Sequence, residues 1–354
     1  MSKPPAPIPV TIITGFLGSG KTTFLNQILR SVEFKNTVVI VNEFGDIGLD
    51  HLLVESVNEN TVLLSSGCLC CTIRDDLIST LENLLRSRDN NRMVAFDRVI
   101  IETTGLADPA PILHTIMGHK YLSLRYQLQG IVTLVDAVNG LATLKQFPES
   151  MKQVAVADRL IVSKCDIADA KIQLELVAYI KSLNPAAQIL NTSESLVNIF
   201  NIIDCGLYNP DTKSPDVRRW LNEEALNEVL DSHEGHTHDT EPTLSQDANR
   251  HSDEIRAFCF TSSTPISLQA YSVFTELLRS VHGENLLRVK GILYLSDTPD
   301  QPLIVQGAQH VFHPPVFLER WPFQPKHTKL VFIARDLKPE LIEKIWAALV
   351  GGVC

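Results

Sequence analysis

The 354-residue sequence lacks the features of membrane, secreted and nucleic-acid-binding proteins. It has no apolar run approaching the length that spans a bilayer, and its start, Met-Ser-Lys-Pro-Pro-Ala-Pro, contains no apolar signal core. Basic residues number 31 against 41 acidic ones, whereas nucleic-acid-binding domains usually carry a basic face. We therefore expect a cytoplasmic protein with neither a membrane nor a nucleic acid among its partners.

Cysteine is also scarce, at seven residues, yet three stand close together at Cys68, Cys70 and Cys71. A disulfide framework is not expected in a reducing compartment, and cysteines this close in sequence bridge one another poorly. The cluster therefore indicates a redox sensor, a metal site or three small core residues.

The first two-fifths of the chain alternates strand-like and helix-like segments. Residues 77–85 repeat apolar side chains at helical spacing, as an amphipathic helix does. Short β-branched or continuously apolar runs, typical of buried strands, occupy residues 10–14, 37–41, 61–64, 99–101, 131–135 and 160–162. This alternation predicts an α/β fold with a mostly parallel sheet flanked by helices.

The length predicts about two domains. The α/β pattern ends near residue 205, and a polar, acidic stretch separates it from a second ordered pattern. We expect a disordered lead (1–8), an α/β domain (9–205), a histidine-containing linker (206–254) and a smaller α+β domain (255–354). In that last domain we predict strands at 255–262, 287–295, 302–312 and 328–334, with helices at 267–280 and 338–349.

Residues 15–22, Gly-Phe-Leu-Gly-Ser-Gly-Lys-Thr, match the pattern G-x-x-x-x-G-K-[ST] between a strand and a helix. Such glycines let backbone N–H groups curl round a polyphosphate, and the helix N-terminus adds a favourable dipole. We expect Lys21 to reach the β- and γ-phosphates and the Thr22 hydroxyl to hold Mg²⁺. The predicted nucleotide-binding residues are Gly15, Gly18, Ser19, Gly20, Lys21, Thr22 and Thr23.

Two further segments are predicted to face the γ-phosphate. Glu102 ends an apolar strand, where it holds Mg²⁺ or orients the attacking water; the alternative is an acid that caps the next helix. Gly105 could offer its N–H to the γ-phosphate. Glu43 follows the second strand, where nucleotide switches sense the γ-phosphate, and is a candidate ligand of Mg²⁺ or of a second metal, as is Asp46. Lys21, Glu102 and Glu43 are the predicted catalytic residues.

Residues 163–166, Ser-Lys-Cys-Asp, follow the strand-like run at 160–162. GTPases recognise guanine with Asn-Lys-x-Asp at this place; Lys164 and Asp166 are in register, and Ser163 replaces Asn. A carboxylate that accepts two N–H bonds from guanine leaves adenine with unpaired groups, which creates specificity. The tetrapeptide favours GTP, and the alternative is a P-loop kinase or ATPase in which it is a coincidence.

Together these segments resemble the CobW-type P-loop GTPases, a family related to the hydrogenase and urease nickel-insertion GTPases. The resemblance implies a GTPase that carries a transition metal, namely zinc, cobalt or nickel, to a client metalloprotein. It also implies the family's C-terminal domain. The segments that carry it are 15–22, 42–45, 67–71, 102–105, 163–166, 286–291 and 305–307.

The Cys-x-Cys-Cys stretch suits a soft metal such as Zn²⁺. Cys68 and Cys70 can share one ion, while Cys71 is either a third ligand or packs inward. The fourth ligand must then be water, Glu43, a histidine or a partner, and such an incomplete shell lets a client's ligands enter. His233, His236 and His238 in the linker are further candidates; the alternative is a solvated polar stretch without metal affinity.

The cysteines lie between the two segments that are predicted to face the γ-phosphate. We therefore expect metal affinity to depend on the bound nucleotide. No arginine finger is evident, which predicts slow turnover that a partner or a homodimer accelerates. The competing hypothesis is a regulatory GTPase switch whose cysteines sense oxidation.

Overall fold

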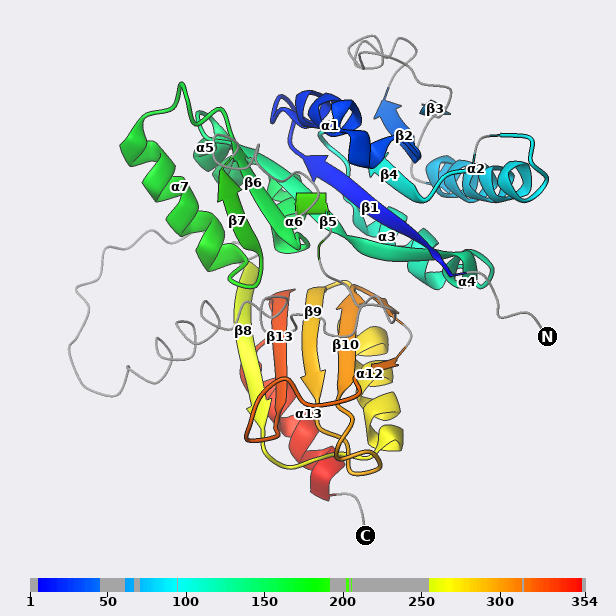
Figure 1. Cartoon of the computed structure of the whole chain (residues 1–354). Helices are drawn as coiled ribbons and strands as arrows, with labels where there is room; N and C mark the ends of the chain where they lie inside the picture. Colours follow the sequence, from blue (N-terminus) through cyan, green and yellow to red (C-terminus); the bar gives the residue numbers. More distant parts are fainter. Residues whose placement is uncertain are drawn as a thin grey trace. The chain divides into compact units, whose positions relative to one another are not determined.

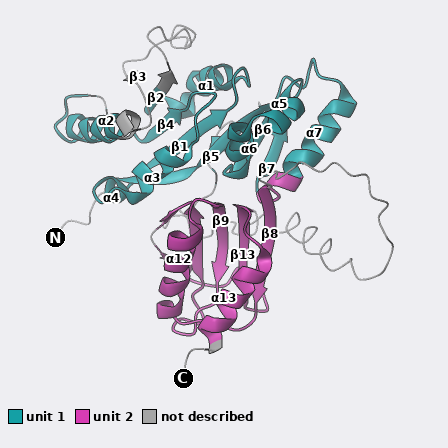
Figure 2. Cartoon of the chain, turned by 180° about the vertical axis from the view of Figure 1, so that it is seen from behind, with its two compact units in different colours: residues 1–181, 187–216 teal, residues 182–186, 217–354 magenta. Residues whose placement is uncertain are grey.

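The computed structural model of the chain describes residues 6–44, 61–66, 71–93, 95–191, 202–203, 205, 255–313 and 315–351. They belong to two compact units, residues 1–181 with 187–216 and residues 182–186 with 217–354 (Figure 2). Within the described ranges, no helix has the length and apolar character needed to cross a membrane.

The first unit is built on a seven-stranded parallel sheet in the order β3-β2-β4-β1-β5-β6-β7 (Figure 1). The six strands predicted from the sequence are all present, and β7 is an addition that its short, half-buried run did not reveal. Their bounds are β1 Ile8–Gly15, β2 Thr37–Phe44, β3 Thr61–Ser66, β4 Arg98–Glu102, β5 Tyr126–Asp136, β6 Arg159–Ser163 and β7 Gln188–Asn191.

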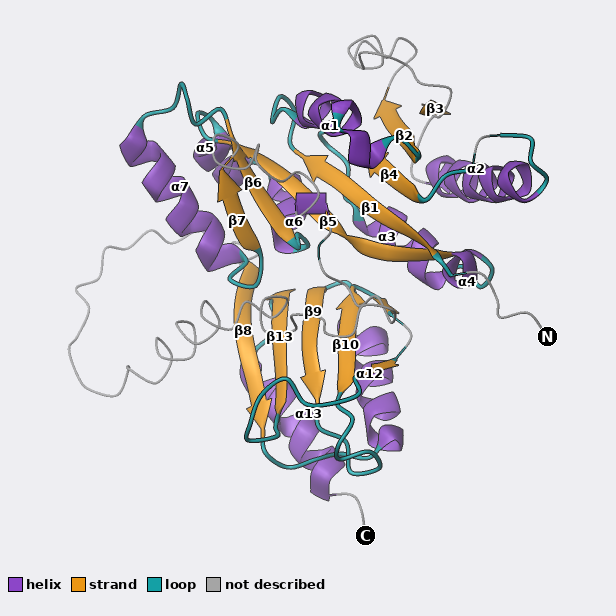
Figure 3. Cartoon of the chain, in the orientation of Figure 1, coloured by secondary structure: helices purple, strands orange, loops and turns teal. Residues whose placement is uncertain are grey.

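The helices of the first unit flank this sheet, which confirms the predicted α/β fold (Figure 3). Helix α1 packs Phe24, Leu25 and Ile28 into the core beside Ile13 of β1. The helix expected at 77–85 lies within α2. The bounds are α1 Lys21–Arg30, η1 Val32–Phe34, α2 Cys71–Asp89, α3 Ala110–Gly118, α4 Leu122–Arg125, α5 Gly140–Gln146, α6 Pro148–Ala155 and α7 Ala170–Leu183.

Strand register brings the polar strand ends to one edge of the sheet. In the parallel pairs, Ile13 of β1 is aligned with Glu102 of β4, and Asp136 of β5 with Ser163 of β6. Because the carboxyl ends of parallel strands point the same way, these residues meet at the end of β1. That edge is where the sequence places its phosphate-binding loop.

The expected disordered lead is too long by at least one residue. Ile8 is the first residue of β1 and is only 3% exposed, because it pairs with Tyr126 at the start of β5. Residues 1–5 and the whole of the expected linker, 206–254, lie outside the described residues.

The second unit has a six-stranded sheet in the order β11-β10-β9-β13-β8, with β12 paired to β10. Its strand pairs are antiparallel, so this unit has the predicted α+β character. The bounds are β8 Ile255–Ser262, α12 Leu268–His282, β9 Leu286–Leu293, β10 Leu303–Ala308, β11 Val311–Phe312, β12 Val316–Phe317, β13 Thr328–Arg335 and α13 Pro339–Gly351.

An aromatic core joins this sheet to its helices. Phe274 of α12 and Trp346 of α13 meet edge to face at 5.5 Å, and Phe258 stacks on Phe332 across β8 and β13. The single strand predicted at 302–312 is in fact two, because Gln309 has a φ of 50° and turns the chain so that Ala308 pairs with Val311.

Gly291 of β9 tests how closely the second sheet is packed. A Cβ there would clash with the carbonyl oxygen of Lys329 and lie 2.8 Å from the Cα of Leu330, both in the backbone of β13. We expect Gly291→Ala to cost about 1–3 kcal/mol and to lower the Tm of the second unit in a thermal unfolding scan. Gly18→Ala is the control, because its Cβ meets nothing within 4 Å and adds only left-handed strain, about 1 kcal/mol. Equal losses in the two variants would contradict this account.

Candidate functional site

The loop between β1 and α1 has the backbone shape that a phosphate site needs. Gly18 and Gly20 have φ values of 72° and 91°, a left-handed region that side chains with a Cβ disfavour. Gly20 is also the N-cap of α1, so the loop passes directly into the helix N-terminus. The backbone N–H groups of such a turn are suited to a polyphosphate.

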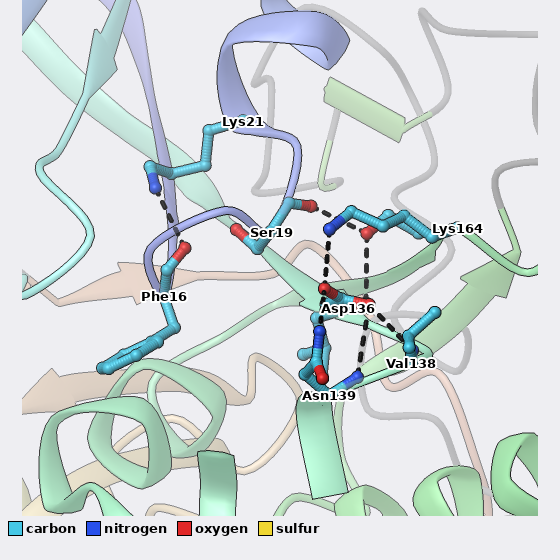
Figure 4. Close-up of polar contacts among 9 residues, drawn as sticks. Phe16, Ser19, Lys21, Asp136, Val138, Asn139 and Lys164 are labelled. Atoms are coloured by element: carbon cyan, nitrogen blue, oxygen red, sulfur yellow. Dashed lines mark hydrogen bonds and ion pairs between the residues drawn. The ribbon is translucent and has the colours of Figure 1, made fainter. Parts of the chain in front are cut away.

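Lys21 extends back across this loop. Its Nζ donates to the carbonyl oxygens of Gly15 at 3.0 Å and Phe16 at 3.2 Å, and the residue is 9% exposed (Figure 4). Because anionic oxygens are stronger acceptors than carbonyls, phosphate oxygens can replace these contacts. The ammonium group therefore lies against the loop. Its contact with the β- and γ-phosphates stays a prediction.

Thr22 and Glu102 meet although 80 positions separate them. The Thr22 hydroxyl donates to Glu102 Oε1 at 3.1 Å, and Glu102 is 4% exposed. The Thr103 hydroxyl donates to that of Thr14 at 2.7 Å, which holds the end of β4 against the end of β1. A hydroxyl and a buried carboxylate are hard oxygen donors, so this pair fits Mg²⁺.

Gly105 lies directly on the phosphate-binding loop. A Cβ at this position would stand 2.6 Å from the backbone N of Leu17 and 2.7 Å from its Cα. Only glycine permits this close approach to the loop. The contact of its N–H with the γ-phosphate stays a prediction.

The tetrapeptide 163–166 is bonded to the same loop. The Ser163 hydroxyl donates to the carbonyl oxygen of Ser19 at 2.7 Å. This contact gives the serine that departs from the guanine pattern a role of its own, because it holds β6 against the phosphate-binding loop. Asp166 is exposed beyond it, where it can meet a base.

Asp136 is the residue of this edge that the sequence prediction missed. Its Oδ2 accepts from Lys164 Nζ at 2.7 Å, and its Oδ1 accepts from the backbone N–H of Val138 at 2.7 Å (Figure 4). Lys164 itself has a φ of 59°. Its position in the sequence could have identified it, because Asp136 is an acidic residue at the end of a buried strand, as Glu102 is.

The charge state of Asp136 follows from these contacts. Burial raises the pKa of its carboxyl, but the hydrogen bonds from Lys164 and from the Val138 N–H outweigh it and hold the pKa below the ordinary 3.8. The carboxylate therefore stays ionised and keeps the Lys164 ammonium beside the loop.

The predicted metal ligands lie mostly outside the described residues. Cys68, Cys70, Asp46 and the histidines 233, 236 and 238 are not described, and Glu43 in β2 and Cys71 at the start of α2 are described only as backbone. In the described part of the chain, no group of three His, Cys, Asp or Glu side chains could hold a metal ion. The thiolate site stays a prediction.

Comparisons with known proteins agree with this geometry. A sequence model of the CobW/HypB/UreG nucleotide-binding domain matches residues 9–191, and one of the cobalamin synthesis protein cobW C-terminal domain matches residues 255–350. The zinc chaperone YjiA of Escherichia coli (strain K12) is 32% identical over 344 residues, which cover 97% of this chain and 99% of that protein.

Two further similarities extend over most of the chain. The zinc-regulated GTPase metalloprotein activator 1 of Schizosaccharomyces pombe is 32% identical over 359 residues, covering 95% of this chain and 82% of that protein. The crystal structure of Zn(II)-bound YjiA GTPase from E. coli has a TM-score of 0.66 and 28% identity, covering 98% of this chain and 99% of that one.

The Asp136–Lys164 pair predicts a pH-dependent contribution to stability. A folded-state pKa below 3.8 means that the contribution is present at pH values above 3.8 and is lost as the pH falls through the folded-state pKa. We expect Asp136→Asn to lower the free energy of unfolding by about 1 kcal/mol at pH 7, a modest value because the Lys164 side chain is 37% exposed.

Urea unfolding at pH 7 and at pH 3 measures this difference. The loss should shrink at the lower pH. Asp89→Asn is the comparison, because Asp89 is also ion-paired, with Arg125, but its side chain is 44% exposed. The hydrogen bond from Arg125 holds the pKa of its carboxyl below the ordinary value, so its smaller loss should also shrink at pH 3. A loss of equal size at both pH values would show that the ion pair is not its cause.

Proposed function

Because the chain belongs to the CobW/HypB/UreG family of P-loop GTPases, we propose that it is a metallochaperone that carries zinc to a client protein. Zinc is held at Cys68, Cys70 and Cys71, and GTP binding and hydrolysis control its release. The observation that carries the nucleotide part is the meeting of the phosphate-binding loop, Glu102 and the 163–166 segment at one sheet edge. The zinc part is supported by the relatives, which are named a zinc chaperone and a zinc-regulated GTPase metalloprotein activator.

In this proposal, different described residues contact the phosphates, the Mg²⁺ ion and the base of the nucleotide. Lys21 exchanges its two carbonyl partners for phosphate oxygens, and Gly105 offers its N–H to the γ-phosphate. Thr22 and Glu102 hold Mg²⁺, which when bound neutralises charge that develops between the β- and γ-phosphates. Asp166 accepts from guanine, while Asp136 holds Lys164 so that its stem lies against the base.

Strand order supports a link between the nucleotide and the cysteines. β4, which ends at Glu102, pairs with β2, which carries Glu43; β2 in turn pairs with β3, so that Glu43 is aligned with Ser65. β3 ends at Ser66 and α2 begins at Cys71, so the connection that contains the cysteines leaves the same edge of the sheet. A γ-phosphate that shifts the ends of β4 and β2 would therefore also act on β3, the neighbour of β2, and on the connection that follows it.

The first prediction of this proposal concerns the metal. We expect Zn²⁺, Co²⁺ and Ni²⁺ titrations to show a site that binds about 5–150-fold more tightly with a non-hydrolysable GTP analogue than with GDP. The combined Cys68→Ala, Cys70→Ala and Cys71→Ala variant should lose this site, and Cys259→Ala, which changes a thiol of the second unit, should keep it.

The outcomes separate the parts of the proposal. Unchanged metal binding in the triple variant would refute the thiolate site. Binding that ignores the nucleotide would leave the site standing but remove the coupling. A triple variant whose nucleotide affinity no longer responds to oxidation, with no metal effect in the wild type, would instead favour the redox switch.

The second prediction concerns the base. We expect GTP to outcompete ATP, and Asp166→Ala to lower GTP affinity about 10–100-fold because guanine loses two hydrogen bonds to a charged group. ATP affinity should not change. Glu175→Ala, which removes another exposed acid, on helix α7, is the control. Equal affinities of the wild-type chain for GTP and ATP would favour a P-loop kinase or ATPase.

A further inference from the structure

Helix α6 contacts both parts of the phosphate site, although nothing in its sequence marks it as functional. At its N-cap, the ring of Phe147 lies 4.7 Å from that of Phe16 in the phosphate-binding loop. Later in the helix, Gln153 reaches the segment that follows Glu102. The helix therefore bridges the loop and the segment that is proposed to sense the γ-phosphate.

Gln153 uses both N–H bonds of its amide on that segment. Its Nε2 donates to the carbonyl oxygens of Gly105 at 3.1 Å and Ala107 at 3.0 Å, and the residue is 1% exposed. Its own backbone carbonyl accepts from the Thr133 hydroxyl at 2.8 Å, which ties it to β5. The backbone of Gln153 is thus bonded to the sheet, and its side-chain amide holds the chain on either side of Leu106.

A second contact joins α6 to the same segment. Lys152 Nζ lies 3.1 Å from Asp108 Oδ2, and both side chains are 28% exposed. The other oxygen of Asp108 accepts from the backbone N–H of Ala110 at 2.9 Å, at the start of α3. Residues 105–108 are therefore attached to α6 at three points.

Side chains do not completely fill the space between α6 and the phosphate-binding loop. A pocket of about 180 Å³ lies there, lined among others by Leu17, Ser19, Gln153 and Val154. Gly105 rests on Leu17 on one side, and its carbonyl oxygen is bonded to Gln153 on the other. Hydrogen bonds therefore have a large part in setting where Gly105 lies.

We propose that Gln153 is a positioning residue for GTP hydrolysis. It holds Gly105 by its carbonyl oxygen, and so fixes the residue whose N–H is proposed to meet the γ-phosphate. GTP is then favoured over GDP, and the γ-phosphate is aligned for attack. This inference rests on the proposed nucleotide site, since it assigns Gln153 a role through Gly105.

The test replaces the amide with a side chain of similar length that cannot donate. In Gln153→Met, affinity for a non-hydrolysable GTP analogue and kcat should each fall about tenfold, because two hydrogen bonds are lost, one of them to the buried carbonyl of Gly105. GDP affinity should stay within about twofold, since GDP has no γ-phosphate for Gly105 to meet.

Gln173→Met is a matched control. Gln173 of α7 also donates through Nε2 to two carbonyl oxygens, those of Cys165 at 2.7 Å and Ala168 at 3.2 Å, but on the base side of the site. Its loss should affect GDP and the GTP analogue equally. If Gln153→Met also lowered both affinities equally, Gln153 would be a structural support and the inference would be wrong.

Lys152→Ala keeps the inference testable if Gln153→Met does not fold. It removes the partly buried contact with Asp108 and should lower analogue affinity about twofold to threefold with GDP affinity unchanged. No change in analogue affinity would then overturn the inference. A wild-type chain that neither hydrolyses GTP nor distinguishes it from GDP would instead refute the proposed function itself.

Discussion

The phosphate-binding loop keeps its shape because neighbouring strand ends hold its backbone. Lys21 bridges the carbonyls of Gly15 and Phe16, Ser163 donates to the carbonyl of Ser19, and Gly105 rests on Leu17. The contacts of Lys21 and Ser163 engage carbonyl oxygens of the loop, and Gly105 packs against the backbone of Leu17. The Ser19 N–H is bonded within the loop, to the carbonyl oxygen of Phe16 at 3.2 Å. In our proposal, other backbone N–H groups of the loop meet the phosphates.

Strand order divides the two tasks of the site. β5 and β6, on one side of β1, carry Asp136 and lead into the 163–166 segment, which in our proposal serves the base. β4, β2 and β3, on the other side, lead from Glu102 toward the cysteine-containing connection. We therefore expect base recognition to be the same in both nucleotide states. The strands proposed to meet the γ-phosphate are the ones that continue to the proposed metal site. Helix α6 is placed between the two, against the loop and residues 105–108.

Prediction from the sequence succeeded where the signal is local and failed where it is not. Six strands and the phosphate-binding loop were visible as short apolar runs and one eight-residue pattern. β7 was missed because Gln188–Asn191 is short and only half buried. The β10–β11 turn was missed because nothing in the sequence shows that Gln309 takes a left-handed conformation. Ser163 appeared only as a departure from a pattern, because its partner Ser19 is 144 residues away.

The sequence by itself determined the family, the nucleotide chemistry and the order of the elements, because a phosphate-binding loop is built from consecutive residues whose backbone does the binding. Only the tertiary structure decided that Asp136 holds Lys164 and that Gln153 holds Gly105, contacts that join positions 28 and 48 residues apart. Such pairs depend on which strand lies beside which and on how a helix returns over them. That order is set by packing of the whole sheet, which no short stretch of the chain records.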